Sequence, residues 1–311
     1  MIFRSKSGWG AEAAFFVLVL LTLFIPMVFP FTALCVAAPL LWLFTEGHWR
    51  RAMVMITGAM LLSLLSNIWV ILWLFFLAAA VFSFLLGKGL RQREVGHYAV
   101  NATLVWIVFI LLLLVIAKWA GINIISLFTH AMVQGVRASP LLQTLESIPN
   151  NAQGSAMIVQ MVQLVLPGSI VILAVIMTLS NLTVVRFTQT LLRPDTQPVM
   201  RYFRLPRSIG LAYVIIVAGV LLGLGSSTGI VSLLVNTAFL LVTFLLSLQA
   251  TAVLWWIVRE KVKAVPVTLL AVIAAFCTLF IVIVFEEIFV LFGLVDVVLD
   301  IRKRMSGSNV K

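Results

Sequence analysis

The sequence predicts an all-α protein, built as a polytopic bundle of transmembrane helices. Three observations carry this prediction. First, 63% of the residues are hydrophobic and only 10% are charged, whereas a soluble domain is about half apolar and about a quarter charged. Second, the apolar residues stand in long runs separated by short polar breaks. Third, the basic residues gather in alternate breaks, as they do in membrane proteins with one cytoplasmic side.

The basic residues define one side of the membrane. When the polar breaks are assigned alternately to two sides, all but two of the 21 lysine and arginine residues fall on one side, and the exceptions are Lys118 and Arg137. Cytoplasmic loops carry such an excess of lysine and arginine. Because both chain ends lie on the basic side, we expect the N-terminus and the C-terminus in the cytoplasm.

Composition and motifs exclude several classes of protein. The net charge of +11 does not indicate a nucleic-acid partner, because the basic residues lie at segment ends and form no continuous patch. Cys35 and Cys277 stand alone inside apolar runs, and the three histidines are isolated, so no metal-binding spacing is present. Nucleotide-binding and metalloprotease motifs are missing from the sequence. We therefore expect no enzyme activity, no cofactor and no metal site.

The apolar runs of the first 120 residues predict the N-terminal helices. A spanning helix needs about 20 apolar residues. Ala11–Phe29 and Tyr98–Ala120 reach that length, whereas Thr32–Phe44 is short and predicts a tilted or partly buried helix. Ala52–Leu86 is too long for one crossing. We place a turn at Asn67, because an unpaired amide is costly in lipid.

The middle of the chain alternates between the two sides. Gly121–Ala156 is the one substantial external segment, and its apolar stretches predict one or two amphipathic helices at the interface. Ser169–Val185 predicts a span, with Pro167-Gly168 at a helix start or a kink. Arg186–Arg207 follows as the largest cytoplasmic loop and carries five arginines.

Two further spans and a C-terminal run complete the predicted bundle. Ile209–Leu224 and Ile230–Val258 cross the membrane with a tight turn between them. The run 266–298 is long enough to fold back near Glu286, which returns the basic C-terminus to the cytoplasm. The apolar lengths predict roughly eight to ten crossings, and we favour ten.

The predicted segments group into three parts. Residues 1–120 form the N-terminal transmembrane helices, and residues 121–156 form the external amphipathic segment. Residues 157–311 form the C-terminal helices, with the basic cytoplasmic loop at 186–207 and a basic tail.

Polar side chains inside the apolar runs are the candidate binding residues. Asn236, Thr243 and Ser247 are spaced by seven and four residues, so they share one helix face. Such a face either lines a cavity for a solute or forms hydrogen bonds between helices. Glu286 and Glu287 stand between two apolar stretches, where a cation- or proton-linked site, a structural ion pair and a solvated surface turn are the alternatives.

Two other sets of residues are candidates for contacts with helices or partner proteins. Gly219, Gly223 and Gly225 form a GxxxG pattern with one further small residue, which permits close helix packing. The basic loop and tail are candidate docking elements for a partner. The alternative for the tail is a helix end whose cations meet its own carbonyls and the lipid headgroups. The candidate docking residues are Arg201, Arg204, Arg207, Asp296, Arg302, Lys303 and Arg304.

Three short stretches carry a family resemblance. Residues 166–168 (Leu-Pro-Gly) start a central span, residues 201–208 (Arg-Tyr-Phe-Arg-Leu-Pro-Arg-Ser) open another, and residues 291–296 precede the Asp-Ile-Arg-Lys-Arg of 300–304. The chain thereby resembles the YybS-like family of bacterial membrane proteins, a domain of unknown function. Its N-terminal helices are distantly similar to the S components of energy-coupling-factor vitamin transporters. The resemblance implies the bacterial inner membrane and a helical substrate-binding fold that works with separate ATPase and coupling subunits.

Three functions stay open on these observations. In the first, the chain binds and transports a small hydrophobic or amphipathic solute, which a closed pocket near the outer leaflet holds under residues 121–156. Alternatively, it is a structural or scaffolding subunit of a larger membrane complex, with the basic loop among its contacts. The third function is ion- or proton-coupled transport through Glu286 or Glu287. The expected partners are the lipid bilayer and other membrane or ATPase subunits.

Overall fold

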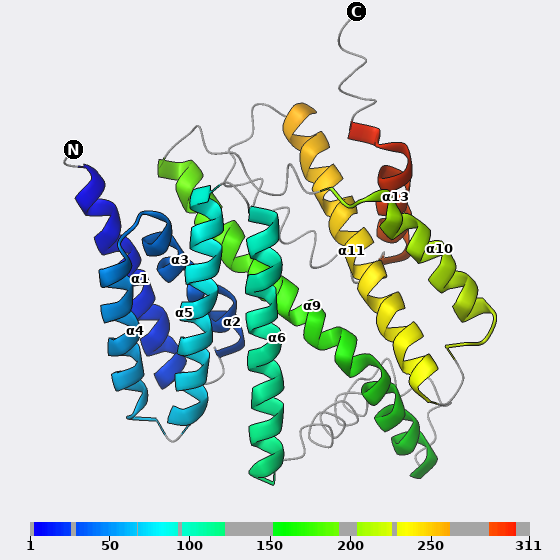
Figure 1. Cartoon of the computed structure of the whole chain (residues 1–311), viewed down its shortest axis with the longest axis horizontal. Helices are drawn as coiled ribbons and strands as arrows, with labels where there is room; N and C mark the ends of the chain where they lie inside the picture. Colours follow the sequence, from blue (N-terminus) through cyan, green and yellow to red (C-terminus); the bar gives the residue numbers. More distant parts are fainter. Residues whose placement is uncertain are drawn as a thin grey trace, which may run out of the picture. The chain divides into compact units, whose positions relative to one another are not determined.

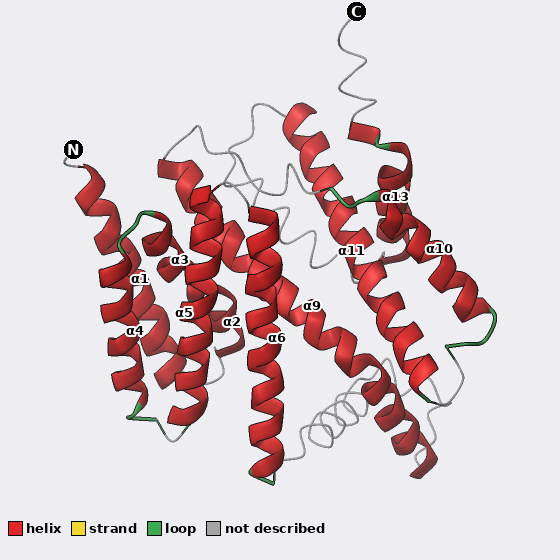
Figure 2. Cartoon of the chain, in the orientation of Figure 1, coloured by secondary structure: helices red, strands yellow, loops and turns green. Residues whose placement is uncertain are grey.

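The regular structure of the described residues is helical. The computed structural model describes residues 3–25, 29–66, 68–92, 95–121, 152–192, 204–225, 229–261 and 286–302. All regular structure in these ranges is α-helical, and Figure 2 shows no strand among them. The predicted all-α class is therefore confirmed.

The helices form two compact units, which are described separately below. Unit 1 contains Met1–Ser155 and Ile170–Thr196, and unit 2 contains Ala156–Ser169 and Gln197–Lys311. One long helix, α9, therefore contributes its two parts to different units (Figure 1). The N-terminal helices therefore share a unit with residues 170–196. The three parts predicted along the sequence had placed those residues with the C-terminal helices.

Unit 1 is built from the N-terminal helices and the second part of α9. Its helices are α1 (Phe3–Phe24), α2 (Phe29–Cys35), α3 (Ala37–Thr45), α4 (Trp49–Ser63), α5 (Trp69–Gln92), α6 (Val95–Trp119) and α9 (Ala152–Leu192). The predicted turn inside the long apolar run is present, because α4 ends at Ser63 and α5 begins at Trp69. The Ser66 hydroxyl accepts a hydrogen bond from the Ile68 N–H in this turn, at 3.3 Å. Asn67 itself lies outside the described residues.

The core of unit 1 is filled by aromatic rings. Phe75, Phe82 and Trp106 are fully buried. The Trp106 ring lies 5.9 Å from the Phe75 ring and 5.3 Å from the Phe82 ring, between centroids. Helices α5 and α6 approach closely at one end, because a Cβ on Gly89 would overlap the Tyr98 side chain. Large rings thus occupy the space between these two helices, as expected of a close-packed interior.

The second part of α9 packs onto α6 in unit 1. The hydroxyl groups of Thr103 and Thr178 are 3.0 Å apart and hydrogen-bonded to each other. Met177, Leu182 and Val185 are buried on the same helix. Unit 1 therefore closes around a segment that lies more than 50 residues beyond the end of α6.

Unit 2 is formed by the C-terminal helices and the first part of α9. Its helices are α10 (Arg207–Leu221), α11 (Ile230–Lys261) and α13 (Glu286–Leu299). Val242 and Leu246 of α11 pack against Val290 and Val297 of α13. These two helices touch backbone to backbone, because a Cβ on Gly293 would collide with the Leu246 carbonyl. Helix α13 is described from Glu286 onward, and residues 262–285 lie outside the described residues, so the predicted fold-back near Glu286 stays a prediction.

Helix α9 passes through Pro167, so of the two alternatives predicted for Pro167-Gly168 the helix start is wrong. The helix begins at Ala152 and carries Pro167 in its interior. An interior proline removes one helical hydrogen bond, a loss that neighbouring helices can offset. Gly168 is buried, and a Cβ there would come within 2.8 Å of the Leu240 side chain of α11. Helix α9 therefore packs closely against α11 at the residue that follows the proline.

Several helices are long and apolar enough to cross a membrane. Four candidate spans are present in the described residues: Trp69–Arg91, Tyr98–Trp119, Leu164–Arg186 and Ile230–Leu254. Three shorter apolar helices are Gly10–Phe24, Thr32–Thr45 and Arg207–Leu221. The predicted multi-pass character is confirmed. The count of eight to ten crossings stays a prediction, since residues 121–156, predicted to be external, and the run 262–285 lie mostly or wholly outside the described residues.

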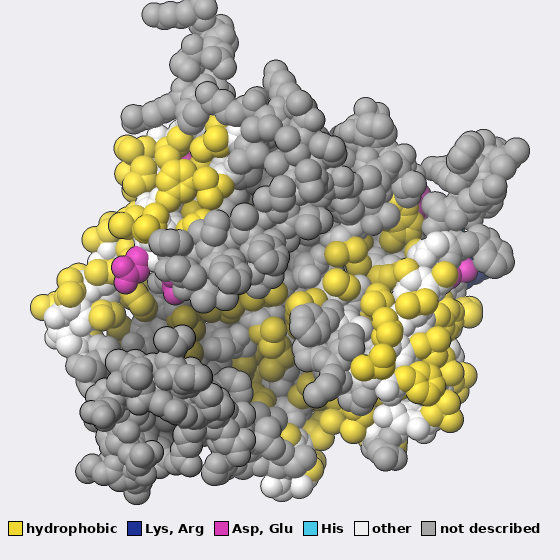
Figure 3. All heavy atoms as spheres, turned by 180° about the vertical axis from the view of Figure 1, so that it is seen from behind, with side chains coloured by type: hydrophobic (Ala, Val, Ile, Leu, Met, Phe, Trp, Pro, Cys, Tyr) yellow, Lys and Arg dark blue, Asp and Glu magenta, His cyan; other side chains and the backbone are white. Residues whose placement is uncertain are grey.

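The surface of these helices suits lipid rather than water. Only 17% of the Tyr98–Trp119 window is buried inside the protein. Leu104, Val108 and Val115 of that window are exposed. Figure 3 shows hydrophobic side chains over much of the described surface on one face. Exposed apolar area on this scale marks a membrane surface.

Candidate functional site

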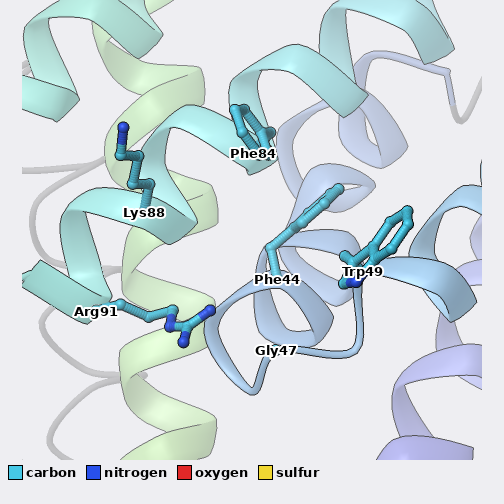
Figure 4. A pocket seen from close by; sticks show the side chains of 6 residues that line it. All are labelled: Phe44, Gly47, Trp49, Phe84, Lys88 and Arg91. Carbon is cyan, nitrogen blue, oxygen red and sulfur yellow. The ribbon is translucent and has the colours of Figure 1, made fainter.

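A pocket opens at one end of unit 1, beside the turn between α3 and α4. Its volume is about 480 Å³. It lies against the last turns of α5 (Figure 4). The residues that line it are Phe44, Gly47, Trp49, Phe84, Lys88 and Arg91.

The turn that shapes the pocket depends on a glycine. Helix α3 ends in two backbone hydrogen bonds, from the Gly47 N–H to the Phe44 carbonyl at 3.2 Å and from the His48 N–H to the Leu43 carbonyl at 2.8 Å. This is the hydrogen-bond pattern of a Schellman motif, in which the residue after the helix adopts a left-handed conformation. Gly47 has a φ of 83° and fills that place. The chain then reverses directly into α4.

Aromatic side chains form the apolar wall of the pocket. The Phe44 ring is buried and meets the Phe84 ring edge to face, with 5.8 Å between centroids. Phe84 and Trp49 are more than half exposed, at 54% and 58%. Helix α5 lies close to this wall, because a Cβ on Gly87 would come within 2.8 Å of the Phe44 Cβ. The wall is therefore anchored in the protein on one side and open on the other.

Two cations form the rim. Lys88 and Arg91 lie one helical turn apart on α5, and Lys88 follows Phe84 by four residues, so all three share a helix face. In Figure 4 the Arg91 side chain extends toward Gly47. Lys88 lies 6.0 Å over the Tyr98 ring, in cation–π range. A pocket with an aromatic wall and a cationic rim can hold a molecule that is apolar at one end and negatively charged at the other.

A second group of polar residues lies buried in unit 2. The Arg302 guanidinium contacts the Asp296 carboxylate at 3.1 Å, and both side chains are 2% exposed. The Gln249 amide donates a 2.5 Å hydrogen bond to the same carboxylate oxygen. The Gln249 carbonyl oxygen in turn accepts a 3.1 Å hydrogen bond from the Leu205 N–H. This Gln249–Asp296–Arg302 cluster joins α11, α13 and the segment before α10.

A left-handed residue makes the ion pair of this cluster possible. Asp300 has a φ of 46°, a conformation that asparagine and aspartate visit more readily than most residues. The chain turns there after α13, and Arg302 reaches back to Asp296. Outside the cluster, Arg204 contacts Asp300 at 3.5 Å on the exposed surface. A fully buried ion pair that also accepts an amide hydrogen bond is suited to hold helices together.

The cluster corrects part of the predicted docking set. Asp296 and Arg302 are buried, so neither can contact a partner protein while unit 2 is folded, and Arg302 meets a carboxylate rather than headgroups. Arg204 and Arg207 are exposed at the start of α10. Arg201, Lys303 and Arg304 lie outside the described residues.

The predicted polar face of α11 does not act as one group in the structure. The Asn236 amide donates to the Gly225 carbonyl and to the Ser232 carbonyl, both at 2.9 Å, so it closes the α10–α11 turn. Thr243 and Ser247 are buried, and their hydroxyl oxygens have no hydrogen-bond partner among the described residues. Glycine at position 225 leaves room for the Asn236 amide, whose oxygen would lie 3.4 Å from a Cβ there.

The glutamate pair and the GxxxG glycines lie at helix ends. Glu286 and Glu287 are exposed in the first turn of α13, where carboxylates complement the helix dipole. Gly223 has a φ of 82°, and the Leu224 N–H donates to the Gly219 carbonyl while the Gly223 N–H donates to Val220. Gly223 therefore ends α10 in a Schellman motif instead of lying on a helix face.

The sequence prediction did not include the pocket residues. One signal was present, since the spacing of Phe84, Lys88 and Arg91 puts an aromatic ring and two cations on one face of a helix end. Phe44 and Gly47 line the other side of the pocket. They reach it only through the packing of α3 against α5, which the sequence pattern does not show.

Fold and site together define a helical multi-pass membrane protein with a cation-rimmed pocket at the end of its spanning helices. No group of three or more potential metal ligands occurs among the residues that the structure describes. The chain belongs to the family described as predicted membrane protein (DUF2232), whose sequence model matches residues 13–297. No curated protein and no solved structure matches the chain.

Proposed function

We propose that this protein is the solute-binding component of a membrane transport system. It holds a small amphipathic molecule in the pocket between α3, α4 and α5, and separate ATPase and coupling subunits supply the energy. Its role is binding rather than catalysis, and its place is the inner membrane of a bacterium. The observation that carries the proposal is the pocket, which combines three aromatic side chains with Lys88 and Arg91.

The size and chemistry of the pocket support this role. Small-molecule sites have volumes of about 300–1,000 Å³ and combine an apolar lining with a few polar groups that fix orientation. The volume of about 480 Å³ falls in that range. This pocket is not the one predicted near the outer leaflet under residues 121–156. Most of those residues lie outside the described residues, so the outer-leaflet pocket stays a prediction.

Native mass spectrometry of the protein, extracted gently from its own membrane, tests the proposal. We expect a single chain that carries a defined small mass. Phe84→Ala should lower the bound fraction, because it removes part of the wall. Leu77→Ala is the matched control, since Leu77 lies on the same helix, is similarly exposed at 51%, and does not line the pocket.

Two outcomes would count against solute binding. A chain that carries no small mass, but copurifies in fixed stoichiometry with other subunits, would favour the scaffolding role. A bound mass that is equally occupied in wild type and Phe84→Ala would place the solute elsewhere in the protein.

A further inference from the structure

We infer that the ligand of this pocket is an anionic phospholipid. Its phosphate-bearing head lies at the rim formed by Lys88 and Arg91, and its acyl chain leaves along the exposed side of Phe84. This inference rests on the proposed binding function and names the substrate class of the same site.

The position of the rim along α5 points to the headgroup level of the bilayer. The candidate span of this helix runs from Trp69 to Arg91, so Arg91 lies in the last turn of α5 and Lys88 lies one turn before it. Side chains at that place leave the hydrocarbon and meet the headgroups. Trp49 adds an aromatic ring at the same end of unit 1, as is common where a membrane protein crosses the interface.

The exposure of the wall allows a lipid to enter from the side. Phe84 is 54% exposed on the face of a spanning helix, whereas Phe44 behind it is buried. A pocket of about 480 Å³ accommodates a headgroup and the start of one chain, while the rest of the lipid stays in the bilayer. A solute taken from water would need no such opening toward the hydrocarbon.

The charge of the lining selects an anion. The lining residues that the structure describes include two cations and no carboxylate, although Glu46 lies in the same turn. The Arg50 guanidinium lies 5.6 Å from the centroid of the Trp49 ring. Arginine pairs with phosphate through two parallel N–H groups, and lysine adds a compact charge. A zwitterionic headgroup presents its own cation to this rim, so an anionic headgroup is the better match.

The test is native mass spectrometry of the full chain in a delipidating detergent, titrated with phosphatidylglycerol, phosphatidylcholine or inorganic phosphate. We expect phosphatidylglycerol to bind in preference to phosphatidylcholine. The Lys88→Gln/Arg91→Gln double variant should lose about tenfold or more in phosphatidylglycerol affinity, because two charge-assisted contacts to phosphate are removed. Inorganic phosphate alone should compete weakly, since it cannot use the aromatic wall.

Arg51→Gln is the matched control for general attraction between a basic protein end and an anionic lipid. Arg51 is exposed, lies in the adjacent α4, and does not line the pocket. Its variant should bind phosphatidylglycerol as the wild type does. Equal losses in the control and the double variant would overturn the inference, as would equal binding of the two lipids. Circular dichroism and melting temperature check that each variant is folded.

Failure of the lipid inference can be told apart from failure of the proposed function. A non-lipid mass from the host membrane that is lost in the double variant, with no competition from phosphatidylglycerol, would refute the lipid and leave solute binding in place. If neither a host-derived mass nor phosphatidylglycerol responds to the pocket variants, both proposals are wrong. If inorganic phosphate competes as well as the lipid does, the site is a soluble-anion site.

Discussion

At the scale of single residues, Asp296 and Arg302 form an ion pair whose two charges are both buried in unit 2. Removing two charges from water costs several kcal/mol per ion, and their attraction offsets that cost only when geometry and hydrogen bonding are good. Here the contact is 3.1 Å, and Gln249 contributes a further hydrogen bond to the carboxylate. The pair fixes the position at which the chain after α13 returns to the bundle.

Removing one partner of this pair should destabilise unit 2 strongly. Arg302→Met leaves a buried carboxylate without its cation, and we expect a loss of about 3–5 kcal/mol in the free energy of unfolding. Arg204→Met is the control, since its pair with Asp300 is exposed and 3.5 Å long, and it should cost less than about 1 kcal/mol. Denaturant unfolding in detergent, followed by circular dichroism, measures both. Equal losses in the two variants would contradict a special role for the buried pair.

The residue types of this cluster were visible in the sequence, but their pairing was not. Arg302 stands near a basic tail, where headgroup contact or partner docking is the natural expectation. Its true contact depends on the left-handed turn at Asp300, which brings together two residues six positions apart. Gln249 joins them from a different helix. Local spacing contains no information on either event.

At the scale of elements, the contact between α11 and α13 depends on one missing side chain. Gly293 lies where a Cβ would collide with the backbone of Leu246. Backbone atoms cannot swing aside as the end of a side chain can, so any larger residue must push the two helices apart. Gly210 offers a contrast, because a Cβ there would meet only side-chain methyl groups, the closest on Val297 at 3.3 Å.

Gly293→Ala should therefore separate α11 from α13. We expect a destabilisation at the upper end of the range of about 1–3 kcal/mol for overpacking. Gly210→Ala should stay within about 1 kcal/mol of the wild type, because better helix propensity offsets slight crowding. Thermal unfolding of the two variants side by side provides the measurement. A larger loss for Gly210→Ala than for Gly293→Ala would show that the helix contact is not limited by position 293.

Most helix positions could be predicted from the apolar runs, and the exceptions have physical causes. The turn after α4 and the start of α11 at Ile230 agree with the predictions. Helix α9 differs from the predicted span because it continues through Pro167. The helix packs closely against α11 at the next residue, Gly168. The GxxxG at 219–223 also differs, since a helix-ending glycine and a packing glycine have the same spacing in sequence. The pocket was missed because α3 and α5 are brought together only by tertiary packing.

At the scale of the whole molecule, the sorted charges predict which helix ends face the cytoplasm. Within unit 1, the start of α4, with Arg50 and Arg51, and the C-terminal end of α5 carry basic residues near one pocket, and the far end of α6 carries only Lys118. Positive-inside bias orients membrane proteins through such differences. The lipid proposed for the pocket would then belong to the cytoplasmic leaflet, which is the leaflet with the more negative surface.

Cysteine labelling can test this orientation. In a variant with Cys35 and Cys277 replaced by alanine, a membrane-impermeant thiol reagent should label Lys118→Cys in sealed right-side-out vesicles. Glu46→Cys, in the α3–α4 turn, should react only after the vesicles are opened, because we expect that turn inside. Labelling of Glu46→Cys in sealed vesicles, together with protection of Lys118→Cys, would invert the predicted topology.

The division of α9 between two units bears on how the chain is made. Unit 1 needs residues 170–192 to complete its packing, including the hydroxyl of Thr178 that pairs with Thr103. Ribosomes deliver the chain from its N-terminus, and domains usually form in the order of synthesis. Here α1 to α6 enter the membrane with one face of α6 still lacking its neighbour. The N-terminal bundle therefore gains the α9 segment that carries Thr178 only after translation has passed residue 192.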